Sequence, residues 1–311
     1  MRTIRLGTSG VEVSVLCLGA MYFGSHTDKK LSTQLLDQYV DAGGTFLDSA
    51  NIYSRWIPGF VGGESEEFLG NWMKERNNRS QMFITTKVGF EMPGVERGLK
   101  AEQIEVECEK SLSRLGVDTI DLFYAHVDDR NTPLEETMKA FSRLVESGKV
   151  RYIGASNYLA WRLEEAYSIS KTNHLPQYCC VQQRYSYLRP TAGASFGPQI
   201  AANDDLLDYS RSRGVTILAY SPLLGGAYTR TDKELPEQYV SSHNQARLKI
   251  IQEIAEEKQA TVNQIVLSWM IHSQPAVIPV MGVSTYDQMT ENLKTLAIHL
   301  SSEDMERLNQ A

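Results

Sequence analysis

Short apolar runs alternate with longer amphipathic stretches along the whole chain, and this alternation predicts eight β-α units. The predicted strands cover residues 13–18, 45–47, 82–86, 120–125, 151–154, 178–181, 215–219 and 276–280. A strand that follows a crossover helix runs parallel to the strand before it, because the helix carries the chain back to the starting edge of the sheet. The sequence therefore predicts eight parallel strands.

Ten amphipathic stretches lie between and after these strands. They cover residues 30–42, 64–76, 101–115, 133–147, 159–170, 204–213, 244–257, 262–272, 285–296 and 301–308. Gly43, Gly116, Gly148 and Gly214 directly follow four of these stretches, and glycine readily adopts the left-handed conformation that ends a helix. Because eight units need only eight helices, we expect one additional helix beside the barrel and one C-terminal helix.

The turn after the first predicted strand distinguishes an open dinucleotide-binding sheet from a closed barrel. An open sheet of the Rossmann type carries a GxGxxG turn there, whereas this chain reads GAMYFG from Gly19 to Gly24. No linker or repetitive segment divides the chain. We therefore expect a single domain, residues 1–311, with an α/β fold of the (β/α)8 TIM-barrel class.

The amino-acid composition indicates which kinds of molecule the protein binds. The formal net charge of −7 lacks the surplus of clustered Lys and Arg that nucleic-acid binding needs, so the expected partners are small molecules. No run of 18 apolar residues is present and the first residues lack the apolar core of a signal peptide, so we expect a cytoplasmic protein without a membrane segment. The four cysteines lack metal-ligand spacing, so we expect buried free thiols and no metal site.

Polar residues close six of the predicted strands. Barrel enzymes place their chemistry at the carboxyl ends of the strands, so these residues are candidates for an active site. In chain order they are Asp48, Lys87, His126, Ser156 with Asn157, Gln182, and Tyr220 with Ser221. Tyr53 lies five residues beyond Asp48, in the following loop. We expect Asp48, Lys87 and His126 to share one rim of the barrel, with Tyr53 above them.

These four residue types can together deliver a proton to a carbonyl oxygen. A carbonyl that accepts hydride develops an alkoxide, which needs a proton donor and positive charge nearby. Tyr53 is the expected donor. An adjacent Lys87 ammonium is expected to lower the pKa of the Tyr53 phenol, while Asp48 holds the ammonium in place. We expect His126 to donate a hydrogen bond to the substrate oxygen or to assist proton transfer.

Several segments resemble one known family. They are GGTFLDSANIY at residues 43–53, TTK at 85–87, DLFYAH at 121–126 and GKVRYIGASN at 148–157. In their order and spacing these segments resemble the aldo-keto reductases, and the resemblance runs from about residue 6 to residue 308. It implies a (β/α)8 barrel, a nicotinamide cofactor bound without a Rossmann fold, and catalytic roles for Asp48, Tyr53, Lys87 and His126.

The resemblance also implies cofactor contacts, residue by residue. Ser156, Asn157 and Gln182 match the residues that bind the nicotinamide carboxamide, and Tyr220 matches the aromatic residue that stacks on the nicotinamide ring. The other implied contacts are Ser221, Leu223 and Gly225 along the pyrophosphate, and Ser284, Gln288, Glu291 and Asn292 around the adenosine.

The phosphate preference of the cofactor depends on the segment that begins at Ser284. Many family members carry Arg or Lys at the positions of Ser284 and Thr285, whereas this chain offers hydroxyls and backbone N–H groups at a predicted helix N-terminus. Some relatives with a similar Ser-rich segment, potassium-channel beta subunits among them, still bind NADPH. We expect NADP(H), with NAD(H) as the alternative. Arg230 and Lys233, in a predicted cofactor flap at residues 226–242, are candidate phosphate contacts.

The main prediction is an NAD(P)H-dependent oxidoreductase that reduces an aldehyde or ketone to an alcohol, or the reverse. Tyr22 and Trp56 are expected to line the substrate pocket, with packing of Trp56 against its own loop as the alternative. Arg184 stands where relatives often carry Glu. Two other classes remain open: a cofactor-binding regulatory subunit, and a lyase or aldolase that uses Lys87 as a Schiff base. The sequence leaves the substrate, the preferred direction and the oligomeric state open.

Overall fold

Eight parallel strands close into a barrel in the computed structural model, which describes all residues, 1–311. The order of the strands around the barrel follows the chain, and β10 pairs with both β9 and β3. The strands are β3 (Cys17–Gly19), β4 (Phe46–Asp48), β5 (Phe83–Val88), β6 (Ile120–Ala125), β7 (Val150–Ser156), β8 (Tyr178–Arg184), β9 (Thr216–Tyr220) and β10 (Val277–Gly282). The predicted single-domain (β/α)8 barrel is confirmed.

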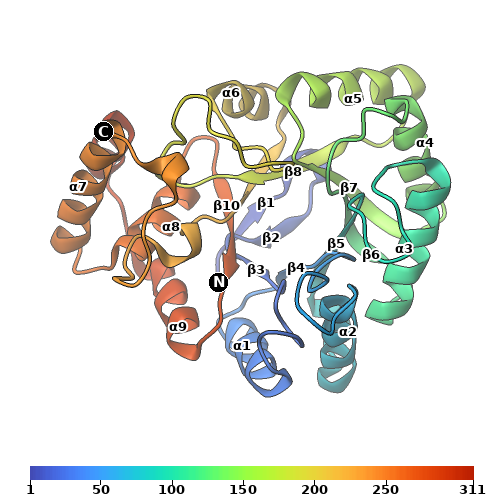
Figure 1. Cartoon of the computed structure of the whole chain (residues 1–311), viewed down its shortest axis with the longest axis horizontal. Coiled ribbons are helices and arrows are strands. Elements are labelled where there is room, and N and C mark those ends of the chain that lie inside the picture. The colour runs from blue at the N-terminus through green and yellow to red at the C-terminus, as the bar shows by residue number, and fades with distance from the viewer.

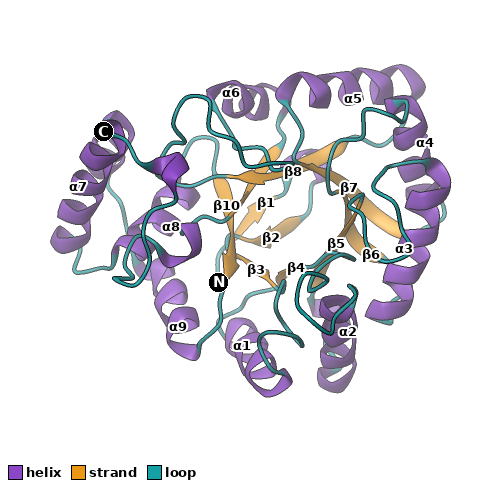
Figure 2. Ribbon diagram, viewed as in Figure 1, coloured by secondary structure: helices purple, strands orange, loops and turns teal.

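Eight helices surround the barrel, and two more lie outside the repeated pattern (Figures 1 and 2). The eight are α1 (Lys29–Asp41), α2 (Glu64–Arg76), α3 (Ala101–Leu115), α4 (Leu134–Glu146), α5 (Ala160–Asn173), α6 (Asp204–Arg213), α8 (Val262–His272) and α9 (Tyr286–Lys294). The other two are α7 (Ser242–Glu257) and α10 (Ser302–Gln310). These two pack against each other and against α8, so the predicted extra helix and C-terminal helix are both present.

Helix boundaries follow local capping chemistry. The Asn203 side chain accepts a hydrogen bond from the Leu206 N–H and so caps the first turn of α6. At the end of α3, Gly116 takes the left-handed conformation, with φ of 63°. Because such signals are local, each predicted helix is present, with ends within three residues of the prediction.

The prediction for the first strand is wrong. Residues 13–18 do not form one strand: β2 (Glu12–Ser14) pairs antiparallel with β1 (Thr3–Arg5), and the barrel strand β3 begins only at Cys17. All six residues from 13 to 18 are buried. An unbroken buried run carries no sign of a break between two strands, so the hydrophobic pattern could not separate them.

The hairpin of β1 and β2 lies across the centre of the ring of strands (Figure 1). Gly7, in the turn after β1, donates its N–H to Thr216 Oγ1 at the start of β9, at 2.7 Å. A side chain at Gly7 has no room, because its Cβ would lie 1.9 Å from the carbonyl oxygen of Cys179. The hairpin therefore closes the barrel at the amino ends of its strands.

Apolar and polar side chains occupy different levels of the barrel lumen. Near the hairpin the inward side chains form an apolar cluster of Leu6, Val13, Cys17, Phe46, Phe83, Leu122, Tyr124, Cys179, Cys180, Leu218, Ile278 and Val280. Side chains two or four residues apart on a strand lie on the same face. Asp48 follows Phe46 by two positions and Lys87 follows Phe83 by four. Both polar side chains therefore face the same lumen, nearer its carboxyl end.

The main hydrophobic core is a cluster of 63 buried residues that packs the strands against the surrounding helices. Because every barrel helix contributes to it, this cluster fixes the strands that carry the rim residues. The four cysteines are buried free thiols, as predicted. None of the helices is both long enough and apolar enough to cross a bilayer.

Candidate active site

Three neighbouring strands bring the predicted proton-transfer residues to one rim. Asp48 ends β4, Lys87 lies one residue before the end of β5, and His126 directly follows β6. These strands pair in parallel register, so their carboxyl ends lie at the same level. The loop after β4 returns Tyr53 to the same place, where its hydroxyl contacts Asp48 and Lys87. The structure thus brings the four predicted residues together.

The Lys87 ammonium is at the centre of this group. Its Nζ lies 2.7 Å from Asp48 Oδ2, 2.6 Å from the main-chain oxygen of Ser49 and 2.7 Å from the Tyr53 hydroxyl. An ammonium has three N–H donors, and these three acceptors use all of them. The Tyr53 hydroxyl donates in turn to Asp48 Oδ2 at 3.1 Å. The positive charge is therefore held in a fixed place beside the phenol oxygen.

The surroundings of Tyr53 keep its phenol protonated. Burial raises the pKa of Tyr53 well above its usual value, and the nearby Asp48 carboxylate raises it further. The pKa of Tyr53 is therefore raised overall, although an adjacent ammonium by itself favours the phenolate. Desolvation and the carboxylate together outweigh the ammonium, whose charge Asp48 already balances. The protonated phenol is the form that can donate a proton.

Burial also lowers the pKa values of the two neighbouring bases, Lys87 and His126. It lowers the pKa of Lys87, an effect that the Asp48 carboxylate opposes. It lowers the pKa of His126 well below its usual value, and the Lys87 charge acts in the same direction. The enclosed Nδ1 of His126 has no hydrogen-bond partner, and its ring lies edge-on to that of Tyr53, with centroids 6.1 Å apart. His126 is thus a neutral imidazole beside the phenol.

The second oxygen of Asp48 is held by two neutral donors. Gln182 Nε2 donates to Asp48 Oδ1 at 2.8 Å, and Thr85 Oγ1 donates to the same oxygen at 3.1 Å. Together with the bonds from Lys87 and Tyr53, the buried carboxylate accepts four hydrogen bonds. Sequence reasoning missed Thr85, although its place two residues before Lys87 on β5 puts the two side chains on one face.

The three residues that the resemblance assigns to the carboxamide are joined by hydrogen bonds. The Ser156 hydroxyl and the Asn157 N–H both donate to the main-chain oxygen of Gln182. Asn157 Nδ2 donates to the main-chain oxygen of His126, and Asn157 Oδ1 accepts from the Tyr220 hydroxyl at 2.7 Å. These contacts tie the ends of β6, β7, β8 and β9 into one rigid part of the rim.

The segment after β9 contains the residues predicted to follow the pyrophosphate. Ser221 has φ of 54°, and Leu223 precedes the 3-10 turn η3 (Leu224–Gly226). Gly225, inside that turn, has φ of 68°. Left-handed residues within a turn redirect successive backbone N–H groups, which is the geometry of backbone anion sites.

The two candidate phosphate cations of the predicted flap are engaged within the protein. Arg230 forms a two-pronged ion pair with Asp232. Lys233 Nζ donates to the main-chain oxygen of Gly225 at 2.9 Å. The Lys233 charge is therefore held beside the predicted pyrophosphate segment, whereas Arg230 is neutralised by its neighbour.

The residues predicted to surround the adenosine lie just before α9 and along it. Gln288 Oε1 accepts hydrogen bonds from the Ser284 N–H, at 2.8 Å, and from the Ser284 hydroxyl. Ser284 is exposed, whereas Asn292 is buried. Glu291 accepts a hydrogen bond from the Thr261 hydroxyl, at the start of α8. The first half of the predicted group is therefore open to a ligand, and the second half packs against the protein.

Aromatic side chains surround the proton-transfer residues. The Trp56 ring lies edge-on to the rings of Tyr53 and Tyr22, with centroids 6.3 Å away in both cases. Trp56 is 47% exposed, so a face of its ring remains free. Phe90, after β5, packs edge-on against His126 at 4.8 Å. Sequence reasoning missed Phe90, because it lies in a loop without regular periodicity.

Two arginines support the loops of this rim. Arg55 forms an ion pair with Glu91 at 2.8 Å and so joins the loop that carries Trp56 to the loop that follows β5. Arg184 stacks over the ring of Phe196 at 4.5 Å and donates to Gln199. The cation at residue 184 therefore fixes the long loop after β8 by stacking and a hydrogen bond.

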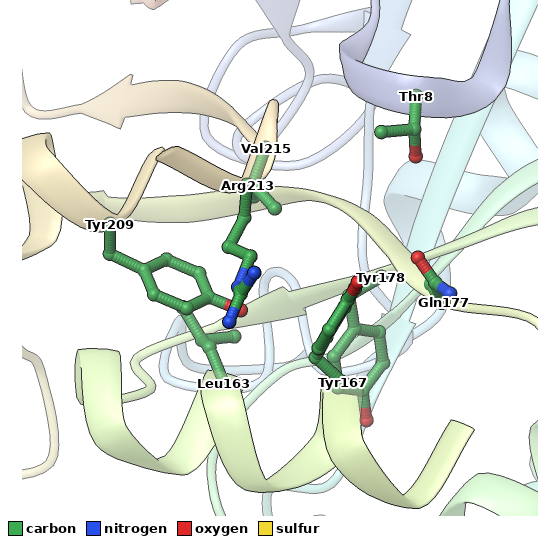
Figure 3. A pocket seen from close by; sticks show the side chains of 8 residues that line it. All are labelled: Thr8, Leu163, Tyr167, Gln177, Tyr178, Tyr209, Arg213 and Val215. Atoms are coloured by element: carbon green, nitrogen blue, oxygen red, sulfur yellow. The ribbon is translucent and has the colours of Figure 1, made fainter. Parts of the chain in front are cut away.

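A small pocket lies at the opposite end of the barrel (Figure 3). Its volume is about 10 Å³, and Figure 3 shows the rings of Tyr167, Tyr178 and Tyr209 around it with Arg213 between them. The Arg213 guanidinium stacks over the Tyr167 ring at 4.5 Å. The pocket adjoins the amino ends of β8 and β9, so it is separate from the group around Lys87.

A closed parallel barrel whose carboxyl rim joins a phenol, an ammonium, a carboxylate and an imidazole defines a class, the barrel oxidoreductases. Comparison with known proteins narrows this class. The model of the Aldo/keto reductase family matches residues 15–311. The chain belongs to this family, whose members are nicotinamide-dependent oxidoreductases that reduce carbonyls.

Individual relatives agree with this assignment over nearly the whole length of this chain. The chain is 32% identical to the uncharacterized oxidoreductase YrpG of Bacillus subtilis, with 98% of this chain and 94% of the relative covered. It is 29% identical to norsolorinic acid reductase A of Aspergillus parasiticus, with 98% and 79% covered. Among solved structures, a thermostable aldo-keto reductase, Tm1743, in complex with the inhibitor epalrestat matches with a TM-score of 0.78, 29% identity, and 100% and 99% covered. The chain is accordingly an NAD(P)H-dependent aldo-keto reductase.

Proposed function

We propose that this protein reduces an aldehyde or ketone to an alcohol with NADPH, or catalyses the reverse reaction, and that Tyr53 is the general acid and base. The hydroxyl of Tyr53, which lies 2.7 Å from Lys87 Nζ and 3.1 Å from Asp48 Oδ2, is the observation that carries this proposal. A phenol beside an ammonium can release a proton outward because the positive charge stabilises the phenolate that forms, and the phenolate then takes up another proton from solvent.

Each residue of the group has a separate task. Tyr53 holds the proton that the reduced oxygen receives. Lys87 places positive charge where the phenolate forms, and a fixed charge in a dry site stabilises it strongly. Asp48 keeps Lys87 oriented through the 2.7 Å ion pair. His126, as a neutral imidazole, offers a hydrogen bond to the substrate oxygen. The substrate lies between these groups and the rings of Tyr22 and Trp56.

The rim residues fit a nicotinamide cofactor. Gln182 Oε1 makes no hydrogen bond within the protein, so it is free for an amide, and Tyr220 offers a ring beside it. A nicotinamide bound here supplies the hydride. We place Ser156, Asn157, Gln182 and Tyr220 around the nicotinamide, with Ser221, Leu223 and Gly225 along the pyrophosphate and Ser284, Gln288, Glu291 and Asn292 around the adenosine. A small-molecule carbonyl partner and a cytoplasmic location accompany this proposal.

The exposed N-terminus of α9 supports the preference for NADP(H). The helix N-terminus favours an anion such as the 2′-phosphate, and Ser284 is exposed there. Turnover efficiency measured with NADPH and with NADH tests the preference. Higher kcat/KM with NADH would reverse it without affecting the role of Tyr53.

The role of Tyr53 is tested by Tyr53→Phe, which keeps the ring and removes the proton. We expect reductase activity to fall by about 10² to 10⁴, while the Kd for the oxidised cofactor, measured by quenching of protein fluorescence, stays near that of the wild type. Undiminished turnover of Tyr53→Phe across a panel of aldehydes and ketones would refute the proposal.

A further inference from the structure

The loop after β5 folds back on itself as a short hairpin. Backbone hydrogen bonds close this hairpin at two levels, between Gly89 and Gly98 and between Met92 and Val95. Both pairs belong to one antiparallel register, in which Phe90 lies opposite Arg97. The guanidinium carbon of Arg97 lies 5.6 Å from the centre of the Phe90 ring. The hairpin therefore holds Arg97 over the ring that packs against His126.

Arg97 differs from the other arginines of the neighbouring loops because it has no acidic partner. Arg55, in the loop after β4, forms an ion pair with Glu91. Arg130, in the loop after β6, forms an ion pair with Asp128. Arg97 is exposed and makes no ion pair or hydrogen bond within the protein. A hydrogen bond from its own backbone N–H and the charges of Arg55 and Arg97 lower the pKa of Glu91. One carboxylate therefore faces two guanidinium groups, which leaves a surplus positive charge at Arg97.

This surplus charge lies beside the place that the substrate occupies. In the proposed reaction the carbonyl oxygen contacts Tyr53 and His126. The Trp56 ring packs edge-on against Tyr53, with centroids 6.3 Å apart. The Phe90 ring packs edge-on against His126, with centroids 4.8 Å apart. Aromatic side chains on both sides favour a flat apolar ligand. Beyond Phe90 the next group is the Arg97 guanidinium, so a substituent of such a ligand can reach a cation without a partner.

We propose that the substrate is an aromatic aldehyde or ketone with a carboxylate substituent, and that Arg97 binds this carboxylate. This inference rests on the proposed function and names its substrate class. A guanidinium presents paired N–H donors whose spacing matches the two oxygens of a carboxylate. The net charge of the protein is −7, so an anionic substrate needs a local cation that no acidic residue neutralises. Arg97 thus determines specificity and takes no part in proton transfer.

Matched aldehydes test the recognition of the charge. The probes are 3- and 4-carboxybenzaldehyde, each compared with its neutral amide of similar shape, 3- or 4-formylbenzamide. The quantity measured is the kcat/KM for the acid divided by the kcat/KM for its amide. Differences in intrinsic reactivity between the two aldehydes cancel when this ratio is compared between proteins. We expect Arg97→Met to lower the ratio about tenfold for at least one acid, through a higher KM, since one hydrogen-bonded contact with a charged group has about this effect.

Lys100→Met is the matched control. Lys100 ends the same loop and is exposed without an acidic partner, like Arg97, but it directly precedes α3 and stacks on no aromatic ring. We expect this variant to keep the ratio of the wild type, because salt screens a charge that does not touch the substrate. Arg97→Lys keeps the charge and loses the planar fork, so its ratio should lie between those of the wild type and Arg97→Met.

Three results would overturn the inference. A ratio in Arg97→Met equal to that of the wild type would exclude Arg97 from recognition. An equal fall of the ratio in Lys100→Met would assign the effect to the overall charge of this face. Turnover of other carbonyl compounds, without turnover of either carboxybenzaldehyde, would reject the substrate class. A wild-type protein that reduces no aldehyde or ketone with NADPH or NADH would instead refute the proposed function, which is a different result.

Discussion

Phe46 and Asp48 face the same lumen two residues apart, yet they belong to opposite ends of the barrel. Around Phe46 the lumen is filled with apolar side chains and closed by the β1–β2 hairpin. Around Asp48 it contains an ion pair and a hydrogen-bonded amide instead. A layer of apolar side chains stabilises the fold through burial alone. The attraction within a buried ion pair, in contrast, at best offsets the free energy that is lost when its two charges leave water. The comparison separates the end that stabilises the barrel from the end that performs chemistry.

The sharpest test of this comparison removes the charge at the catalytic end. We expect Lys87→Met to lower kcat by about 10² to 10⁴, because the phenolate loses its neighbouring charge. The free energy of unfolding should also fall by about 3 to 5 kcal/mol, because Asp48 is left buried without its partner. Steady-state kinetics and urea denaturation measure the two effects.

The double variant Lys87→Met with Asp48→Asn provides the control. It removes both charges, so we expect most of the lost stability to return and none of the activity. Recovery of turnover in this double variant would contradict the assignment of the carboxyl end to chemistry.

The converse test acts on the hairpin end. Leu122 is fully buried in the apolar layer. We expect Leu122→Ala to lower the free energy of unfolding by about 2 to 5 kcal/mol through the cavity that it leaves, with kcat of the folded enzyme within about twofold of the wild type. Leu122→Met, which nearly conserves volume, should cost less than about 1.5 kcal/mol. A large loss of kcat in either variant would show that the two ends are not separate.

Acid titration gives a third, smaller effect at the catalytic end. Burial lowers the pKa of His126 well below 6.5, so the unfolded chain binds this proton first as the pH falls. The stability that His126 contributes is therefore complete above about pH 6.5 and is lost below it, by about 1 kcal/mol between pH 7.5 and 5.5. Urea denaturation at both values measures the loss, and His126→Asn should show less of it. An equal loss in the variant would assign the effect to other groups.

The smallest effect is expected at the surface of the rim. Arg55 and Glu91 join two loops at the catalytic end, but both side chains are partly exposed, at 31% and 49%. We expect Arg55→Ala to change the free energy of unfolding by no more than about 0.5 kcal/mol, because water screens exposed pairs. KM measured at low and high salt reports whether the loops loosen. A salt-dependent rise in KM for the wild type but not for Arg55→Ala would show that the pair holds the substrate loops.

Much of the fold and of the candidate site could be predicted because it depends on local pattern. Alternation along β5 places Lys87 in the lumen, and the parallel register of β4, β5 and β6 brings Asp48 and His126 beside it. Residues 13–18 show the limit of such patterns. A buried hairpin strand and a buried barrel strand have the same hydrophobicity, and only their partners differ.

The properties that could not be predicted depend on the combined effects of residues that lie far apart in the sequence. The pKa of Tyr53 was expected to fall beside Lys87, yet it rises, because burial and Asp48 together exceed the effect of the ammonium. Similarly, the side-chain oxygen of Asn157 accepts its two hydrogen bonds from the Ile200 N–H and the Tyr220 hydroxyl, which lie far along the chain. No single segment carries that information.

The contact between Gly7 and Thr216 has a consequence for how the chain assembles. These residues are separated by 209 positions, so at roughly 5 to 20 residues per second the ribosome needs about 10 to 40 seconds to deliver the partner of the hairpin. During that interval the apolar face of the first residues has no site to occupy. The segment that leaves the ribosome first is thus among the last to dock, and nascent chains halted before β9 should present it to chaperones.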